Sequence, residues 1–426
     1  MPNFSIPLSG LTSEATALSA IANNLANQNT TGYKDSQVLF SDLFYQNLGT
    51  TGSGDPIQLG AGASVGSMPS MFTQGSVSST GVPTDVAIQG NGFFVVQQDG
   101  ITSYTRSGNF SVDKNNYLVT ADGQQVLGYP AVNGAVNTGE ALAPLQLGAG
   151  TISPPSATGN VQIQTNLDAA ATVGGSDGTY STELAVYDSL GASHTLTFTF
   201  TKTDANTWGY TISVPSADLS PVGNPPVPQT GVLATGTLTF DGNGKLVGPV
   251  DANGKLVSSI NVTASNLADG ASNMAFKWNL LNGTTPVISQ VAAPSSTSST
   301  QQDGTSSGTL TDFSIGSDGT ITGSFSNGKT AALGQLALAS FANDEGLQRV
   351  GNTDYSPTLA SGQAVIGAPG TAGRGTLSGG SLELSNVDIS SEFANLIIAQ
   401  RAFEANAKAV TTFDTVMSDT INMKQG

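Results

Sequence analysis

The sequence predicts a multidomain, mainly β protein with an α-helix at each end, the two helices pairing as a coiled coil. Its domains are discontinuous and nested around a central β insert. Apolar residues recur at helical spacing at both ends of the chain. Between the ends, apolar and polar residues alternate as they do in strands. Glycine supplies 52 of the 426 residues, which is typical of many tight turns between short elements.

The first predicted helix lies in LSGLTSEATALSAIANNLAN and is about 20 residues long. Its apolar face consists of Leu8, Leu11, Leu18, Ile21 and Leu25. Ser9 is a suitable N-cap, and Gly32 in TTGY supplies a stop. We therefore assign residues 1–32 to a helical domain.

A linker arm is predicted for residues 33–70, because GTTGSGDPIQLGAGASVGSM (49–68) is rich in Gly and Ser. After it, VAIQGNGFFVVQQDG, SYTRSGNFSVDKNNYLVTADG and QQVLGYPAV alternate between turn sequences, as in a β-meander. We assign residues 71–150 and 331–384 to an inner β-domain.

The outer inserted β-domain is predicted for residues 151–330. In SHTLTFTFT and NTWGYTISV, large apolar residues alternate with polar ones, so residues 186–214 are expected to form a hairpin in a sheet covered on one side. The low-complexity tract APSSTSSTQQDGTSSGT (293–309) is expected to be a solvent-exposed loop.

The second helix is predicted in SNVDISSEFANLIIAQRAFEANAKAVTTFDTVMSDTINM, where Ser385 and Asp388 resemble a capping box. The pattern exceeds about 30 residues, which favours a coiled coil over a globular helix. Its apolar seam is Ile389, Phe393, Leu396, Phe403, Val410, Met417 and Ile421. Residues 385–426 therefore complete the terminal helical domain.

Neither terminal helix buries its apolar stripe alone, and two arrangements account for this. In the first, the ends pair as part of an ordinary domain core. In the second, they pair with each other and then with other subunits, because a two-helix hairpin still leaves apolar surface uncovered. Periodicity does not separate the two.

Composition limits the partners. The chain has 13 Lys and Arg residues and a formal net charge of −17, which disfavours nucleic acid and anionic membranes. No stretch of 18 or more apolar residues is available for membrane insertion. The first basic residue is Lys34, so a cleaved secretory signal is not expected. Cysteine is absent, which removes disulfides and thiolate chemistry.

GSFSNGKT (323–330) fully matches the phosphate-binding loop G-x-x-x-x-G-K-[ST]. Such a loop must follow a buried strand and open a helix whose N-terminus holds the anion. Here DGTITGSF before the motif and QLALASF after it both alternate with period two. We therefore predict a hairpin turn in which Asn327 and Gly328 supply the permissive backbone and Lys329 faces solvent.

Other apparent motifs carry no chemistry. The single histidine, His194, shares strand parity with Leu196, so we expect an edge-of-core residue without a ligand cluster. G-x-S-x-G matches at 174–178 and 304–308 do not follow a strand-to-helix elbow. The repeat in 241–257 lacks the Glu that a calcium loop needs. The sequence thus predicts no catalytic, cofactor or metal residue, and no enzyme.

Several blocks resemble the bacterial flagellar axial rod and hook family, and the hook proteins in particular. LSGLTSEATALSAIANNLANQNTTGYK and SNVDISSEFANLIIAQRAFEANAKAVTTFDTVM are similar to its two terminal signatures. The internal blocks are IQGNGFFVV, TRSGNFSVDKNNYLVTADG, SNGKTAALGQLALASFANDEGL and GSLELSNVD. The resemblance covers roughly residues 5–45, 80–130 and 318–423, whereas residues 150–315 match no motif. The large β insert favours hook over rod proteins.

The resemblance implies a structural subunit that polymerises into a curved, flexible tube carrying motor torque from rod to filament. Its implied partners are further copies of itself, the distal rod, the hook cap, the hook–filament junction proteins and the export apparatus. The implied location is extracellular, at the hook of the flagellar basal body, after type III export. The 49–68 arm would then act as a stiffener or a hinge. The alternatives are a rod-type axial protein and a secreted carbohydrate-binding or adhesive β-protein.

Overall fold

The computed structural model describes residues 5–132, 134–147, 152–223 and 226–423. It contains two compact units. Unit 1 comprises Met1–Ala149, Thr311–Ser324 and Thr330–Gly426, and unit 2 comprises Gly150–Leu310 and Phe325–Lys329. Both helices belong to unit 1, and within the described residues neither is both long and apolar enough to cross a membrane.

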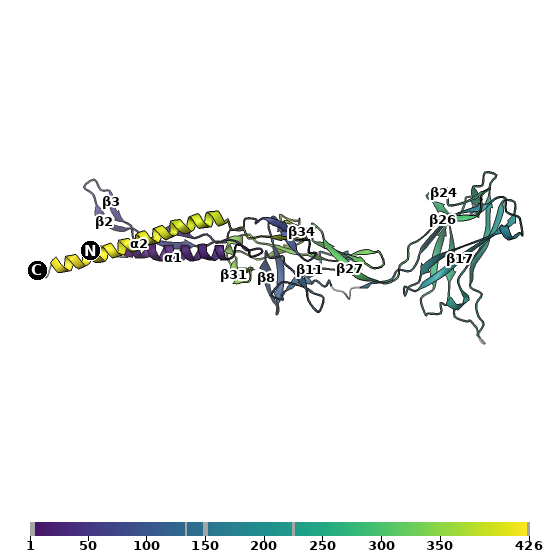
Figure 1. Ribbon diagram of the computed structural model, residues 1–426, viewed down its shortest axis with the longest axis horizontal. Helices are drawn as coiled ribbons and strands as arrows, with labels where there is room; N and C mark the ends of the chain where they lie inside the picture. The colour runs from purple at the N-terminus through teal and green to yellow at the C-terminus, as the bar shows by residue number, and fades with distance from the viewer. Residues whose placement is uncertain (1–4, 133, 148–151, 224–225, 424–426) are drawn as a thin grey trace. The chain divides into compact units, whose positions relative to one another are not determined.

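The helices α1 (Ser5–Ala26) and α2 (Ile389–Met423) pack side by side (Figure 1). Their directions are opposed, because Gly10 contacts Asn406 while Asn24 near the other end of α1 interacts with Glu392. In the part of the chain that the structure describes, α1 ends at Ala26, and a turn leads to Gly32, whose φ of 69° is left-handed.

Both predicted helix caps are wrong. Ser9 lies inside α1, where its Oγ donates to the carbonyl of Ile6 at 2.7 Å. The cap of α2 is Asp388, whose Oδ1 accepts the backbone N–H groups of Ser390 at 2.8 Å and Ser391 at 3.2 Å. Ser385 instead closes a small turn by accepting the N–H of Val387. The carboxylate directly before the helix reaches the unpaired amides of the first turn, and Ser385 is too far upstream to do so.

Residues 39–67 form two antiparallel strand pairs instead of an extended linker. The pairs are β1 (Leu39–Asp42) with β4 (Ala63–Ser67), and β2 (Gln46–Thr50) with β3 (Pro56–Leu59). The turn between β2 and β3 is closed by the N–H of Thr51 donating to the carbonyl of Asp55 at 2.8 Å. Apolar residues among the glycines give these strands enough alternation to pair.

The β body of unit 1 is built on one large sheet whose strands differ in length. Its main path runs β28 (Thr320–Phe325), β29 (Thr330–Leu336), β11 (Gln125–Val132), β7 (Phe93–Gln98), β8 (Ile101–Thr105), β32 (Asp354–Ser356) and β31 (Gln348–Gly351). Strands joined to it are β9 (Ser111–Val112), β10 (Leu118–Val119), β12 (Ala135–Val136), β13 (Ala143–Pro144), β27 (Gly308–Ile315), β30 (Leu338–Ser340) and β33 (Val365–Gly367). Two further pairs are β6 (Val86–Gln89) with β34 (Thr376–Gly379), and β5 (Val77–Ser79) with β35 (Ser381–Glu383). The antiparallel β7–β8 and β9–β10–β11 pairings match the predicted meander.

Both faces of this sheet are buried. Phe93 and Val95 of β7 belong to one apolar cluster, and Phe94 and Val96 belong to another. Successive side chains of a strand point to opposite faces, so this division places a core on each side of β7.

Unit 2 is a sandwich of two five-stranded sheets. The first sheet runs β16 (Thr179–Tyr187), β17 (Ser193–Asp204), β18 (Thr207–Ser213), β19 (Val232–Phe240) and β20 (Leu246–Gly248). The second contains β21 (Ser259–Ala264), β22 (Met274–Asn279), β15 (Asn160–Asp168), β25 (Ile288–Val291) and β26 (Ser296–Gln302). Shorter strands are β14 (Ile152–Ser153), β23 (Leu281–Asn282) and β24 (Thr285–Pro286).

The predicted hairpin at 186–214 is confirmed as β17–β18 together with the end of β16. Phe198 of β17 packs against Trp278 of the other sheet, with ring centroids 5.3 Å apart. The prediction of an exposed loop at 293–309 is wrong, because β26 pairs with β15. Ser and Thr side chains are compatible with an exposed strand, and Thr297 Oγ1 lies 3.0 Å from Thr165 Oγ1 across the pair.

The GSFSNGKT segment is the turn between β28 and β29, as predicted, and no helix begins at Thr330. The N–H of Phe325 donates to the carbonyl of Lys329 at 2.9 Å, and Gly328 has a φ of 76°. Lys329 is exposed. Asn327 fixes the turn by donating from Nδ2 to the carbonyl of Ser306 at 2.8 Å.

Candidate functional site

The buried face of α1 is made mainly of small residues. Ser13, Ala17, Ala20 and Asn24 are buried, at steps of four, three and four residues. A Cβ added at Gly10 would lie 2.9 Å from Asn406 Nδ2, so α2 approaches α1 closely there. The predicted leucine stripe lies outside this row. Leu8 is 54% exposed, and the half-buried members are Leu11, Leu18, Ile21 and Leu25.

The predicted seam of α2 divides into two groups. Four half-buried members recur every seven residues: Leu396, Phe403, Val410 and Met417. They interleave with a second row spaced by seven: Glu392, Ala399, Asn406 and Phe413. Since Asn406 and Glu392 contact α1, both rows lie on the side of α2 near α1. The other three predicted residues, Ile389, Phe393 and Ile421, are exposed.

The helix pair leaves an apolar surface exposed, which we call the outer helix face. It consists of Leu8, Ile389, Phe393, Ile397, Ile398, Val416 and Ile421. Phe393 is 52% exposed and Ile398 is 67% exposed. Ile398 also borders a groove of about 480 Å³ whose walls include Ile21 and the half-exposed Phe40. Large apolar side chains that a helix pair leaves exposed indicate an interaction surface.

A buried ionic cluster joins the helices to the β body of unit 1. Glu383 is fully buried at the end of β35, and its Oε1 accepts Lys34 Nζ at 2.6 Å and the N–H of Gly75 at 2.9 Å. Its Oε2 lies 3.4 Å from Arg106 Nη1. Burial lowers the pKa of both Lys34 and Arg106, and Glu383 opposes that effect. The carboxylate therefore partly compensates for the burial of both cations.

Backbone contacts tie the two chain ends together at the same place. The N–H of Gly32 donates to the carbonyl of Glu383 at 2.9 Å. A Cβ on Gly32 would lie 2.6 Å from the backbone nitrogen of Ser107, so only glycine fits. The segment after α1 is thereby fixed against the strand that precedes α2.

Two asparagines complete this junction. Asn24 Oδ1 accepts the N–H of Ser36 at 3.0 Å and the hydroxyl of Tyr33 at 3.1 Å. Asn386 Oδ1 accepts the N–H of Asp35 at 2.8 Å, and its Nδ2 donates to Asp35 Oδ1 at 2.9 Å. Sequence analysis did not assign these roles. A polar Asn24 within an apolar helix pattern was the one available signal.

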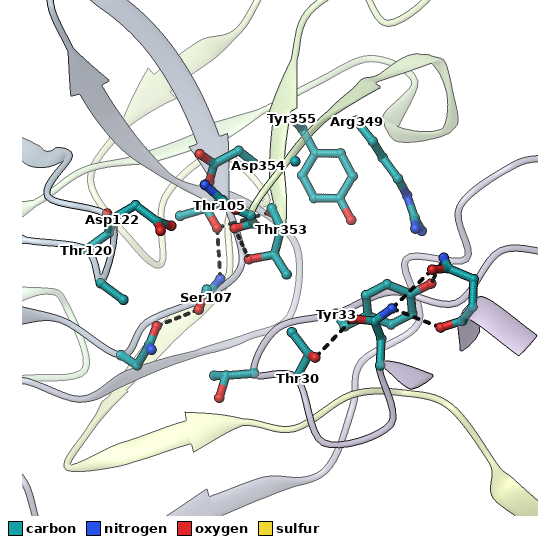
Figure 2. A pocket seen from close by; sticks show the side chains of 17 residues that line it. Thr30, Tyr33, Thr105, Ser107, Thr120, Asp122, Arg349, Thr353, Asp354 and Tyr355 are labelled. Carbon is teal, nitrogen blue, oxygen red and sulfur yellow. Dashed lines mark hydrogen bonds between the residues drawn. The ribbon is translucent and has the colours of Figure 1, made fainter. Parts of the chain in front are cut away.

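A polar pocket of about 490 Å³ lies beside the junction (Figure 2). Arg349 lies over the ring of Tyr33, 5.1 Å from its centroid, and its guanidinium donates to the carbonyl of Lys34. Burial raises the pKa of Tyr355 to about 12 and also raises the pKa of Asp354. Gln124 donates to Asp354 Oδ2 at 2.6 Å. Arg349 and Asp354 therefore both have hydrogen-bond partners within the chain, which fits a structural role.

In unit 2, His194 is buried at the start of β17, as expected of an edge-of-core residue. The expectation that it lacks a ligand cluster is wrong, because three loops bring carboxylates to its ring. Its Nδ1 lies 3.0 Å from Asp218 Oδ2, and its Nε2 lies 3.1 Å from Asp188 Oδ2 and 3.7 Å from Asp269 Oδ2. Burial alone would raise the pKa of Asp188, but contacts with Asp269, His194 and two backbone amides lower it to about 2.

Four known domain families match the chain. They are the flagella basal body rod protein at residues 6–34, the flagellar hook protein FlgE/F/G D1 domain at 87–171, the flagellar basal body protein FlaE D2 domain at 156–305, and the flagellar basal body rod FlgEFG protein C-terminal at 378–423. The matches cover both helices, the inner strands that lie within 87–171, and most of the insert.

Whole proteins match over nearly their full length. The flagellar hook protein FlgE of Treponema pallidum (strain Nichols) is 35% identical, covering 98% of each chain. That of Escherichia coli (strain K12) is 34% identical, covering 99% of this chain and 100% of the relative. The crystal structure of Helicobacter pylori flagellar hook protein FlgE2 aligns with a TM-score of 0.47 at 16% identity, covering 72% of this chain and all of that one. The rod-type and carbohydrate-binding alternatives are not favoured. The chain belongs to the flagellar hook protein family.

Proposed function

We propose that this structural subunit of the flagellar hook assembles with further copies of itself through its terminal helices. The observation that carries the proposal is the division of apolar residues on the helix pair. The small residues of α1 are used within the chain, whereas the large residues of the outer helix face stay in solvent. Contact with a second copy that covered this face would be stabilised by about 25 cal/mol for each Å² of apolar surface removed from water.

Within the subunit, α1 and α2 act as a short antiparallel coiled coil. The interleaved rows of α2 at steps of three and four residues support this, as does the close approach of Gly10 to Asn406. Eight of the twelve seam residues inferred from the sequence then have one of two roles. Leu396, Phe403, Val410 and Met417 hold the pair, and the exposed ones contact other subunits.

A subunit contact that does not close on itself generates an open helical filament, and a tube of this kind is the proposed assembly. It would carry torque from rod to filament as a curved, flexible joint. The proposed partners are further copies, the distal rod, the hook cap, the hook–filament junction proteins and the export apparatus. We place the subunit outside the cell, at the hook, and propose that its role is structural and not catalytic.

We also propose the nested division of domains inferred from the sequence. Residues 1–32 and 385–426 form the helical domain, 71–150 and 331–384 the inner β-domain, and 151–330 the outer one. The compact unit 2 supports a separate outer domain. The N–H of Ala63 in the 33–70 arm donates to Ser9 Oγ of α1 at 3.2 Å. Because this contact attaches the arm to the helix, it favours a stiffener over a hinge.

Electron microscopy under polymerising conditions tests the assembly. Deleting residues 387–426 is expected to leave a soluble monomer with intact β-domains, and Phe393→Asp is expected to abolish tubes because a charge enters the apolar contact. Thr412→Asp adds the same charge at an exposed polar position of α2 and serves as the matched control. Tubes formed by the truncated protein would refute the proposal.

A further inference from the structure

The cluster around His194 lies where three loops of unit 2 meet. Asp188 follows β16, and His194 is the second residue of β17. Asp218 ends the short 3-10 helix Ser216–Asp218, and Asp269 lies in the loop between β21 and β22. The N–H of Ala268 donates to the carbonyl of Asp218 at 2.9 Å, which holds these two loops together. The cluster therefore joins the two sheets of the sandwich.

Two of the carboxylates are fixed by the backbone so that one oxygen of each faces the ring. Asp188 Oδ1 accepts the amides two and four residues further on, at 2.8 and 2.9 Å. Asp269 Oδ1 accepts the amide two residues further on, at 3.0 Å. The remaining Oδ2 atoms of Asp188 and Asp269 are the ones that approach His194 Nε2. Their positions are set by the turns, independently of the histidine.

The charge of this cluster is not balanced by protein cations. Among the described residues, no Lys or Arg forms an ion pair with Asp188, Asp218 or Asp269. Asp188 and His194 are both buried, so solvent screens the negative charge only in part. A second proton on His194 neutralises one of the three carboxylates. A divalent cation neutralises more of the charge and uses the Nε2 lone pair as well.

The distances fit metal coordination. Bond lengths of about 2.0–2.2 Å at tetrahedral or octahedral angles separate neighbouring ligand atoms by roughly 2.9–3.5 Å. Nε2 lies 3.1 Å from Asp188 Oδ2, within this range, and 3.7 Å from Asp269 Oδ2, slightly beyond it. Behind the ring, Asp218 lies 3.0 Å from Nδ1, as an outer carboxylate does when it orients a metal-bound imidazole.

We propose that His194 Nε2, Asp188 Oδ2 and Asp269 Oδ2 bind a divalent transition-metal ion, with Asp218 accepting the Nδ1–H of the same ring. One imidazole and two carboxylates suit Zn²⁺ and similar first-row ions, whereas Ca²⁺ and Mg²⁺ prefer oxygen ligands alone. Three protein ligands leave positions for water. The bound ion clamps the loops at one end of the sandwich and stabilises unit 2.

Calorimetric titration of the full chain, prepared without a histidine tag and treated with chelator, tests the site with Zn²⁺. We expect one ion per chain, and a higher midpoint of tryptophan-monitored unfolding with zinc, since Trp208 and Trp278 both belong to unit 2. Asp269→Asn, at a partly exposed position, and Asp188→Asn are expected to abolish binding. Asp218→Asn is expected to weaken it by roughly 10–100-fold.

Asp251→Asn is the matched control, because Asp251 also caps a turn through Oδ1 but lies outside the cluster. Since His194 is the only histidine, ¹⁵N spectra report its ring without overlap. Zinc is expected to shift the ¹⁵N resonance of Nε2 and to leave Nδ1 protonated. An imidazolium signal unchanged by zinc, no saturable binding at roughly 100 µM zinc, or binding that survives in a folded Asp269→Asn variant would each overturn the proposal.

Discussion

Replacing Glu383 by Gln tests whether the buried ionic cluster holds unit 1 together. The amide keeps the size of the side chain but removes the charge that faces Lys34 Nζ at 2.6 Å and Arg106 Nη1 at 3.4 Å. Breaking a buried ion pair by removing one partner costs about 3–5 kcal/mol, because the other charge stays buried without compensation. For a body of this size, that free energy lowers the unfolding midpoint by roughly 6–20 °C.

The two units provide separate optical signals for this experiment. Both described helices lie in unit 1, so far-UV circular dichroism at the helical band follows that unit. Both tryptophans lie in unit 2, so their fluorescence follows the other. Glu383→Gln is expected to lower the helical midpoint and leave the fluorescence midpoint unchanged.

The control uses an exposed ion pair of the same chemistry. Arg401 and Glu404 lie 3.1 Å apart on α2, with most of both side chains in solvent. Exposed pairs contribute about 0–1 kcal/mol, so Glu404→Gln is expected to change the helical midpoint little. If Glu383→Gln cost less than about 1 kcal/mol, or lowered the fluorescence midpoint equally, the structural role assigned to the cluster would be refuted.

Two further predictions concern α2 and the hairpin. Burial raises the pKa of Glu392; the charge of Asp35 raises it further, and a hydrogen bond with Asn24 opposes the rise. The stability that Glu392 contributes is therefore present below its ordinary pKa and is lost as pH rises through the raised value. Glu392→Gln is therefore expected to raise the helical midpoint at about pH 7 and not at about pH 3.5, and a lower midpoint at neutral pH would contradict this. At Gly328, where φ is 76°, Val is expected to cost about 1–2 kcal/mol. Calorimetry is expected to detect no ATP binding by the unchanged protein or by the Gly328→Val variant. If the unchanged protein bound ATP saturably and the variant did not, the assignment of this segment as a turn would be contradicted.

Strand alternation predicted much of unit 2, because strands such as β17 and β18 bury every second side chain. The β17–β18 hairpin was predictable, since its large residues share one face and meet a second sheet. The tract 293–309 was not, because a Ser- and Thr-rich edge strand has the same composition as an exposed loop.

The helix seam shows a different limit of periodicity. An apolar row has the same spacing whether it packs within the chain or against another molecule. Leu8 and Phe393 were therefore grouped with Leu396, although the first two are exposed and the third is half-buried. The face of α1 that is buried has Ala17 and Asn24 in place of leucines, and hydrophobicity alone gives such a row little weight.

Long-range partners were invisible for a simpler reason. Lys34 and Glu383 are 349 residues apart, and Arg106 is 277 residues from Glu383, so no local pattern connects them. The same holds for His194, whose carboxylates come from three loops of two sheets. Each of these side chains looks like an ordinary surface charge until the topology brings its partner near.

The ionic junction also sets the orientation of the outer helix face within unit 1. The N–H of Gly32 and the carbonyl of Glu383 fix the chain where it leaves α1 and where it approaches α2. Since α1 and α2 pack antiparallel, securing these two points sets the direction of the whole pair within unit 1. Exposed residues such as Phe393 then keep a defined orientation toward the β body, although they make few contacts within the chain. A loose helix pair would present the same apolar side chains in many directions, and a regular filament requires one.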